Sequence, residues 1–359
     1  MNYTALPIDL FIITYNRKTK LLKTLMNVFG RSSPIKSGYR ITILDNCSDD
    51  GTSELIEYYK ELHPQIRHVR HRVNIGGNAN IIEALRLAKK KYFWILCDDD
   101  DYNWDAWDEV EYAVTNSYDV IVTKRLYQSR NIPPEILINE LTFVPAAIYR
   151  TKLVTSDVIQ SAYVNLYTSF PHLSLICKLF NSKNIKFYIL KNTIVSQGGH
   201  MEVSDYTRGV KKNNVHPRQR HVNLMLGYVL SYQMLRDKKF KNKCINNLWI
   251  GKSFLFSAVE YINQNRKYLP NVFEFFMHLT ILQKIQYLFA LVYVYFLPKF
   301  YCRNKWICIN FLGIKTKIFP IINLFKKNVI LNIQNITPYE EKKELKESTE
   351  KKDKIDIIL

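Results

Sequence analysis

The sequence predicts an α/β fold, in which a mostly parallel sheet with flanking helices is followed by a helical C-terminal region. Over the first hundred residues, short apolar runs alternate with amphipathic stretches, which is the rhythm of βαβ units. Some runs are continuously apolar, as at Leu10-Phe11-Ile12-Ile13, which indicates strands covered on both faces. Polar clusters follow these runs, and such sheets bind ligands beyond the carboxyl ends of their strands. A binding site is therefore expected at one edge of the sheet.

The expected elements alternate along the chain. Strands are predicted at residues 8–14, 40–44, 66–70, 92–97 and 120–124, with helices at 21–29, 54–62, 81–88 and 104–115. A second half of the same domain is predicted from strands at 143–149 and 186–195 and helices at 152–164 and 172–180. Glycine, asparagine and charge mix from residue 197 to 215, which is typical of a loop.

The composition indicates a folded and strongly basic protein. The 359 residues are 47% hydrophobic and 23% charged, with a net charge of +19. Residues 203–331 hold 21 Lys and Arg against four acidic residues, so nearly all the excess lies there. A basic, aromatic-rich segment suits anionic lipid headgroups, phosphorylated glycans or nucleic acid, and a solvated basic face is the alternative. The six scattered cysteines indicate reduced thiols in a cytosolic protein, and no signal peptide is expected.

Four consecutive aspartates, residues 98–101, directly follow the apolar run of residues 92–97. Adjacent carboxylates repel one another unless a cation neutralises some of them, and a hard divalent ion prefers oxygen ligands. Mn²⁺ or Mg²⁺ bound here would bridge a diphosphate and stabilise it as a leaving group. A solvated acidic turn is the alternative interpretation.

Three further motifs precede these aspartates. They are Ile13-Thr14-Tyr15-Asn16-Arg17, Leu44-Asp45-Asn46-Cys47-Ser48-Asp49-Asp50-Gly51-Thr52 and Asn74-Ile75-Gly76-Gly77-Asn78-Ala79-Asn80. In order and spacing, the four motifs resemble the family 2 glycosyltransferases of bacterial surface-polysaccharide synthesis, over about residues 7–125. The resemblance implies a GT-A fold, which has a Rossmann-like sheet, and sugar transfer from a nucleotide-sugar.

The resemblance also implies roles for single residues. Thr14 and Asn16 would line the nucleotide pocket, and Asp45 would accept a hydrogen bond from the base, commonly uracil. Asp98 would face the ribose and the metal, and Asp100 would be the firmest metal ligand. The donor-binding residues are predicted to be Thr14, Asn16, Asp45, Asn80, Asp98 and Asp99.

Other roles stay open for some of these residues. Capping of a helix or turn is the alternative for Thr14, Asn16 and Asp45, because short polar side chains satisfy free backbone amides. The family often has arginine before the asparagine matched by Asn80, where this sequence has Ala79.

The remaining candidates are Asp157 and His172 as general bases and His200 as a further metal contact. Inverting family members usually carry an acidic pair well after the aspartate cluster, and this sequence has no such pair. Asp157 is the only acid between Glu140 and Glu202, although an exposed helical carboxylate is its plain alternative. His172 has a suitable intrinsic pKa. His200 follows two glycines and is expected to reach the metal or diphosphate, unless it is simply an exposed loop histidine.

Three regions are expected. Residues 1–215 form the catalytic domain, with a nucleotide-sugar half to about residue 125 and an acceptor half from 126. Residues 216–338 form a helical basic region, and 339–359 a charged tail. Between Lys284 and Lys299 lie 14 uncharged residues, fewer than the roughly 20 that span a bilayer. This piece is predicted to lie on a membrane as an interfacial helix, or to be buried in a soluble helical domain.

The expected activity is metal-dependent, inverting transfer of a hexosyl or N-acetylhexosaminyl group from a UDP-sugar. The acceptor would be a bacterial surface glycan such as lipopolysaccharide, or a lipid-linked precursor, at the inner face of the cytoplasmic membrane. A sugar nucleotidyltransferase is the alternative enzyme, but the segment after the first apolar run lacks the glycine-rich loop it needs. The non-enzymatic alternative is a nucleic-acid or polyanion-binding protein. No nucleic-acid module is recognisable, so no nucleic-acid partner is expected.

Overall fold

The β-branched, apolar run at the start of the chain forms β1 (Ile8–Thr14), a central strand of the sheet. The computed structural model describes residues 5–36, 38–123, 132–166, 168, 170–196, 224–248, 254, 258–259, 261–262, 269–295, 299–303, 306–311 and 314–320. The chain divides into two compact units: unit 1 is Met1–Ser253 with Lys267–Thr280, and unit 2 is Phe254–Arg266 with Ile281–Leu359.

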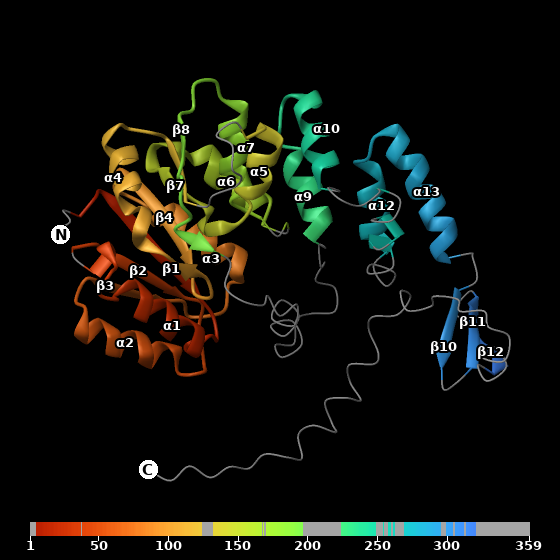
Figure 1. The fold of residues 1–359 in the computed structure, drawn as a ribbon, viewed down its shortest axis with the longest axis horizontal. Helices are drawn as coiled ribbons and strands as arrows, with labels where there is room; N and C mark the ends of the chain where they lie inside the picture. Colours follow the sequence, from red (N-terminus) through yellow and green to blue (C-terminus); the bar gives the residue numbers. More distant parts are fainter. Residues whose placement is uncertain are drawn as a thin grey trace, which may run out of the picture. The chain divides into compact units, whose positions relative to one another are not determined.

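Unit 1 is built on a seven-stranded sheet with helices on its faces (Figure 1). The strand order is β3-β2-β1-β4-β7-β6-β8. All neighbours pair in parallel except β7, which is antiparallel to both β4 and β6. The remaining strands are β2 (Ile41–Asp45), β3 (Ile66–Arg70), β4 (Tyr92–Cys97), β6 (Val120–Val122), β7 (Ala147–Arg150) and β8 (Phe187–Ile189). The predicted mostly parallel α/β fold is confirmed.

Within the described residues up to position 196, seven helices connect or follow these strands. They are α1 (Lys18–Val28), α2 (Thr52–Leu62), α3 (Gly77–Leu87), α4 (Trp107–Thr115), α5 (Pro134–Glu140), α6 (Ser156–Val164) and α7 (Leu173–Asn181). β1, β2 and β3 are each followed by a helix, as predicted. The observed ends of these helices differ from the predicted ones by a few residues.

Both strands predicted in the second half of the domain are shorter than expected. The segment expected as a strand from residue 143 begins with the 3-10 turn Val144–Ala146, because Pro145 has no N–H to give to a ladder. The segment expected from 186 to 195 contains β8 and then the separate strand β9 (Val195–Ser196). β9 pairs with β5 (Asp101–Tyr102), so the chain beyond the aspartates is tied to a segment far along the sequence.

A cluster of aromatic side chains fills the core below the end of β4. Trp94 of β4 stacks on Trp107 of α4 with ring centroids 6.4 Å apart, and meets Tyr102 and Trp104 edge-on. All four side chains are buried. Large, rigid rings in contact hold the end of β4 in one position relative to α4.

Unit 1 also contains α9 (Leu224–Tyr232), α10 (Lys238–Asn247) and α12 (Leu269–Met277). α9 packs on α7, and α10 packs on α5. The Thr142 and Tyr228 hydroxyls lie 3.0 Å apart, and the Cys177 thiol donates to the Ser231 carbonyl. The boundary expected near residue 215 lies outside the described residues, and it does not separate these helices from the sheet-bearing unit.

Unit 2 contains α13 (Ile281–Tyr295) and a three-stranded antiparallel sheet of β10 (Lys299–Arg303), β11 (Trp306–Phe311) and β12 (Ile314–Pro320). These strands lie within the region that the sequence predicted to be helical. Only two residues separate consecutive strands, a spacing that favours hairpins and that the helical interpretation overlooked. Among the helices of the described residues, none is long and apolar enough to cross a membrane.

Candidate active site

The loops that follow β1, β2 and β4 meet at one edge of the sheet. Thr14 and Asp45 are register partners at the carboxyl ends of β1 and β2, and Cys97 of β4 pairs with Ile13. The Asn46 N–H donates to the Thr14 carbonyl at 3.0 Å, which continues the ladder into the loops. The sequence placed its polar clusters at this edge, as parallel strands require.

Asn16 joins the loop after β1 to the loop after β2. Its N–H donates to the Ser48 hydroxyl at 2.9 Å, and its side-chain amide donates to Asp49 Oδ1 at 2.7 Å. The Asp49 N–H returns a bond to Asn16 Oδ1 at 2.8 Å. Asn16 has a φ of 50°, in the left-handed region that asparagine tolerates better than most residues. The side chain therefore clamps two loops together.

Asp45 is fully buried among hydrogen-bond donors. Its Oδ1 accepts from the Ser48 N–H at 2.9 Å, and its Oδ2 accepts from the Ser53 hydroxyl at 2.6 Å. Burial raises the pKa of Asp45, but the nearby His68 and the hydrogen bonds from Ser48 and Ser53 lower it by more, so the carboxylate is ionised at neutral pH. Asp45 is fully buried, so a direct bond to a base, as the resemblance implies, would require neighbouring atoms to move aside.

Two basic side chains face Asp45 from β3. His68 Nε2 lies 3.7 Å and Arg70 Nε 3.6 Å from Asp45 Oδ2. His68 Nδ1 lies 2.8 Å from a carboxylate oxygen of Glu57 on α2. Burial lowers the pKa of His68, but the two carboxylates raise it more, and the net shift is upward. The buried negative charge of Asp45 is thus matched by positive charge from the neighbouring strand.

Asn80 is buried and holds the end of β2 against the loop after β3. Its side-chain amide donates to the Leu44 carbonyl at 3.0 Å, and its Oδ1 lies 3.0 Å from His71 Nε2. The Asn46 amide donates to Asn74 Oδ1 at 2.7 Å, while Asn46 Oδ1 accepts from the Ile75 N–H. This placement supports the loops and gives Asn80 a structural role.

The aspartate turn is fixed by α1 and by Tyr102. The Thr24 hydroxyl donates to the Asp98 carbonyl at 3.0 Å, and the Asn27 amide donates to the Tyr102 carbonyl at 2.9 Å. The buried Tyr102 hydroxyl accepts from the Cys97 N–H and donates to the Cys97 carbonyl. Backbone groups at the end of β4 are therefore bound on several sides, which limits the movement of the carboxylates.

Arg17 neutralises part of the aspartate cluster. Its Nη1 donates to Asp98 Oδ1 at 2.9 Å and to Asp99 Oδ2 at 3.0 Å, and Lys20 lies 3.8 Å from Asp99. Burial raises the pKa of Asp98 to about 6, while Arg17 and Thr14 oppose the rise. The sequence argument asked for a cation among these carboxylates, and an arginine of the chain supplies one.

A divalent ion fits the next carboxylates of the same turn. Among the described residues, ligand atoms of Cys97, Asp99 and Asp100 lie within 4.8 Å of one another. The two carboxylates suit Mg²⁺ or Mn²⁺, whereas the thiol of Cys97 is a softer donor that Mg²⁺ disfavours. Arg17 bonds both Asp98 and Asp99, and of these two carboxylates it is Asp99 that lies in this group. His200, the predicted third contact, lies outside the described residues.

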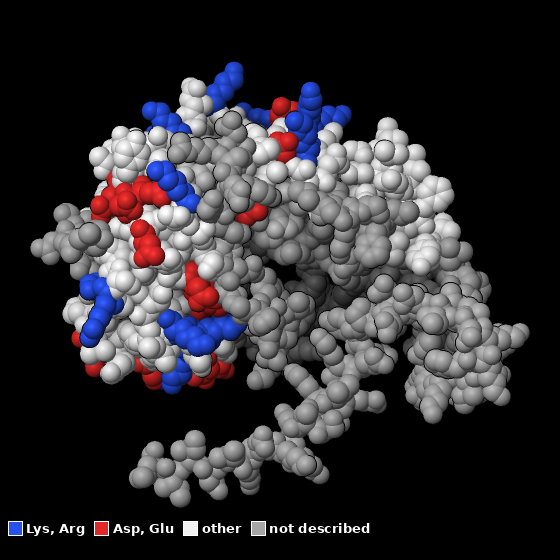
Figure 2. All heavy atoms as spheres, viewed as in Figure 1, with Lys and Arg blue, Asp and Glu red and all other residues white. Residues whose placement is uncertain are grey.

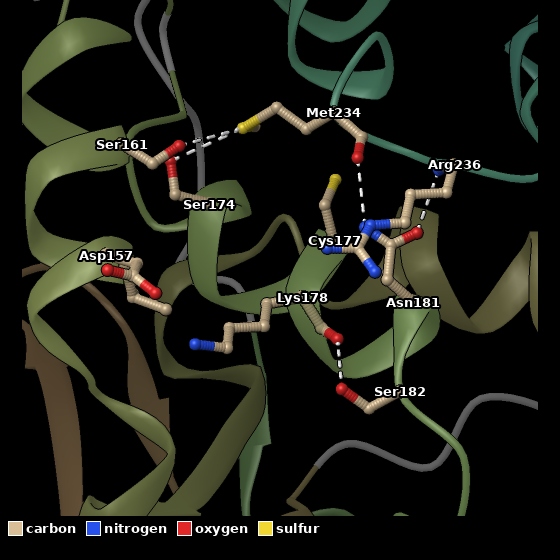
Figure 3. A pocket seen from close by; sticks show the side chains of 10 residues that line it. Asp157, Ser161, Ser174, Cys177, Lys178, Asn181, Ser182, Met234 and Arg236 are labelled. Atoms are coloured by element: carbon tan, nitrogen blue, oxygen red, sulfur yellow. Dashed lines mark hydrogen bonds between the residues drawn. The ribbon is translucent and has the colours of Figure 1, made fainter.

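Asp157 lies at the opposite edge of the sheet. It is in the first turn of α6, which follows β7, and the last residue of β7, Arg150, pairs with Tyr92 at the start of β4. Asp157 lines a pocket of about 270 Å³ with Ser161, Cys177, Lys178, Asn181, Ser182, Met234 and Arg236 (Figure 3). A base must reach the hydroxyl that attacks near the aspartate turn, and Asp157 is placed away from it.

His172 lies near the correct edge but is enclosed. Its ring is 5% exposed, and its Nε2 lies 2.9 Å from the Thr142 carbonyl. That carbonyl only accepts, so Nε2 carries the proton. Burial lowers the pKa of His172 to about 4, so the imidazole is neutral at physiological pH. A side chain without access to solvent or substrate fits a structural role better than proton transfer.

The structure thus brings together Thr14, Asn16, Asp45, Asn80 and Asp98–Asp100, and leaves Asp157 and His172 apart from them. Sequence reasoning missed Arg17 and Asn46 as parts of the site. The signal for Arg17 was its position directly after Asn16 at the end of β1, at the same sheet edge as the aspartates.

Comparison with known proteins agrees with this geometry. The sequence profile of "Glycosyl transferase family 2" matches residues 9–174, the region that contains every element of the site. Over this region, which is just under half of the chain, the protein is similar to the family 2 glycosyltransferases.

Among its relatives, abequosyltransferase RfbV of Salmonella typhimurium is 25% identical over 53% of this chain and 66% of that protein. A putative teichuronic acid biosynthesis glycosyltransferase of Bacillus subtilis, TuaG, is 28% identical over 26% of this chain and 35% of that protein. The chain therefore covers just under two thirds of the first relative and about a third of the second.

A solved structure shares the fold. Residues 1–349 of S. aureus TarS, in complex with UDP, superpose with a TM-score of 0.52 at 14% identity. The alignment covers 87% of this chain and 98% of that one.

Proposed function

We propose that this chain transfers a sugar from a UDP-sugar, with inversion, to a bacterial surface glycan or lipid-linked acceptor. The group transferred would be a hexosyl or N-acetylhexosaminyl group. One observation carries the proposal: the loops after β1, β2 and β4 converge beside the buried carboxylates of Asp98 and Asp100, where Arg17 bonds Asp98 and Asn16 joins the first two loops. RfbV and TuaG are named for sugar transfer and for teichuronic acid synthesis, and TarS binds UDP in its structure, which supports this donor class.

Each residue of the site would contribute differently. Thr14 and Asn16 would line the nucleotide pocket, and Asp45 and Asn80 would hold the loops beneath the base. Arg17 would place positive charge beside the diphosphate. These tasks position the donor so that an acceptor hydroxyl can approach the anomeric carbon from the opposite side, which is the geometry of inversion.

The aspartate turn would hold a divalent cation. Asp99 and Asp100 are the ligands that the structure favours, with Asp98 and His200 as the residues predicted from sequence. When bound, Mn²⁺ or Mg²⁺ would neutralise the charge that develops on the leaving diphosphate. Because the acceptor hydroxyl must lose a proton, a general base is still required, and we assign it to neither Asp157 nor His172.

The acceptor is expected at the inner face of the cytoplasmic membrane, where lipid-linked precursors are exposed. The basic C-terminal half of the chain supports this placement. No nucleic-acid partner is proposed.

Calorimetric titration tests the proposal directly. Purified protein is titrated with UDP, GDP and dTDP, each with Mn²⁺ and with EDTA. We expect UDP to bind only with Mn²⁺, and Asp100→Asn to weaken that binding by at least about tenfold. Asp101→Asn is the matched control, since Asp101 belongs to the same tetrad but is exposed. Binding of no nucleotide, or equal affinity in the Asp100 and Asp101 variants, would overturn the assignment.

A further inference from the structure

One face of α13 exposes apolar side chains to solvent along its whole length. Seven residues between 48% and 82% exposed form this α13 face: Ile281, Leu282, Ile285, Leu288, Phe289, Val292 and Tyr293. Single exposed apolar residues are ordinary, but a continuous face of seven is not. In the view of Figure 2, the described surface at α13 shows no charged side chain of either sign.

The opposite face of the same helix is buried. Gln283, Tyr287, Ala290 and Val294 are at most 6% exposed, and their spacing of four, three and four residues places them on one stripe. With about 3.6 residues per turn, the α13 face covers an arc of roughly 140° on the other side of the helix. Lys284 lies beside this arc and is only partly exposed. The two sides of α13 therefore differ, one buried and the other exposed and apolar.

The length of α13 limits what can cover the open side. Fifteen residues extend about 22 Å, less than the roughly 30 Å hydrocarbon core of a bilayer. A helix of this kind can lie along a surface but cannot cross it. The apolar face would then enter the boundary between headgroups and acyl chains, where amphipathic helices bind.

The charge of the sequence that includes and follows α13 indicates the kind of surface. Residues 275–339 contain eight Lys and Arg and no Asp or Glu. The eight are Lys284, Lys299, Arg303, Lys305, Lys315, Lys317, Lys326 and Lys327. A second protein, or a second copy of this chain, would not require charge of a single sign. An anionic leaflet does attract such a segment, because each basic residue near its surface adds to the binding.

We propose that α13 docks this protein on an anionic lipid bilayer, with the α13 face inserted between the headgroups. The inference deepens the proposed function, on which it rests for the lipid-linked acceptor. It assigns the membrane contact to particular side chains, whereas the sequence alone left open whether this piece is buried or interfacial.

Vesicle sedimentation of the full-length protein tests the inference. One set of vesicles contains phosphatidylcholine alone, and the other adds phosphatidylglycerol. We expect binding to the anionic set, and the double variant Leu282→Glu, Phe289→Glu to lower the partition coefficient on the order of tenfold or more. The matched control is Leu62→Glu, Tyr112→Glu, which changes two exposed apolar residues on α2 and α4 and should bind like the wild type.

Each other outcome has a definite meaning. Equal binding to both vesicle sets would overturn the role of charge, and equal loss in both double variants would overturn the role of the α13 face. A dimer in analytical ultracentrifugation that only the α13 double variant dissociates would make a second copy the occupant. Phe289→Ser serves if the double variant does not fold, as judged by its circular dichroism. Failure of UDP titration in the wild type would overturn the proposed function, and the vesicle result would still decide the docking.

Discussion

Replacing Asp98 by asparagine should stabilise the metal-free protein while it abolishes donor binding. The asparagine keeps the shape of the side chain and an oxygen that can accept from Arg17, but it removes a negative charge that is buried at the end of β4. Functional sites often hold charges that the fold alone would not favour. Asp98 is such a case, because burial outweighs the help it receives from Arg17.

The magnitude follows from the shift in pKa. The pKa of Asp98 is raised from 3.8 to about 6, and at 1.36 kcal/mol per unit the ionised carboxylate costs the folded state about 3 kcal/mol. Asparagine also gives up a charge-assisted bond with Arg17, so we expect a net gain of about 1 to 3 kcal/mol at pH 7.5. Because the folded state binds the proton more tightly, this cost grows as pH rises from about 4 to 6 and is constant above.

Urea unfolding in EDTA, at pH 7.5 and at pH 4, measures the effect. The variant should be the more stable protein at pH 7.5, and the difference should shrink to about 0.5 kcal/mol or less at pH 4, where Asp98 is protonated in the wild type. Adding Mn²⁺ with UDP at about a hundred times the dissociation constant should stabilise the wild type alone, by about 2.7 kcal/mol. Asp101→Asn, at an exposed site, should change the free energy of unfolding by less than about 0.5 kcal/mol.

The reasoning is refuted if Asp98→Asn is less stable than the wild type at pH 7.5 in EDTA. It is also refuted if the difference between them does not depend on pH. Either result would mean that Arg17 compensates the buried charge completely.

Two further predictions concern the supports of the site. The raised pKa of His68 means that its charged form stabilises the fold below about pH 6.5, and that this contribution is lost as pH rises through the folded-state pKa. In His68→Gln, a plot of unfolding free energy against pH should therefore be flatter from pH 6 to 8 than in the wild type, and an unchanged slope would contradict the Asp45–His68 pairing. Tyr102→Phe should cost about 1–2 kcal/mol in urea unfolding, because it removes both bonds to Cys97, and it should also weaken UDP binding. Loss of stability with unaltered UDP affinity would show that the hydroxyl supports the fold but not the site.

The sequence predicted the nucleotide half of the fold well because periodicity and strand ends carry that information locally. β1, β3 and β4 have the predicted bounds, and the polar clusters lie at the predicted edge. The partner of the aspartates was harder to predict. Arg17 and Asp98 are 81 positions apart, and only the pairing of β1 with β4 brings them together.

The second half of the fold was less predictable for a similar reason. Asp157 and His172 were chosen because of their residue types in an acid-poor window, without knowledge of the direction of the chain. The antiparallel insertion of β7 reverses that direction, so the start of α6 lies at the far edge from the aspartate turn. The burial of His172 depends on Phe170 and the Thr142 carbonyl, contacts that no periodic pattern encodes.

The packing of α9 on α7 determines how far the catalytic part of this chain can be shortened. Leu173, Leu175, Ile176, Cys177 and Leu179 are all buried, on more than one side of a nine-residue helix. A protein ending at residue 215 would retain every donor-binding motif but would lose Tyr228, Ser231 and Tyr232, which contact this half of the domain. The donor-binding motifs end at the aspartate turn, whereas the hydrophobic core that supports them continues into α9. An expression boundary drawn from those motifs alone would cut through the hydrophobic interior and invite aggregation.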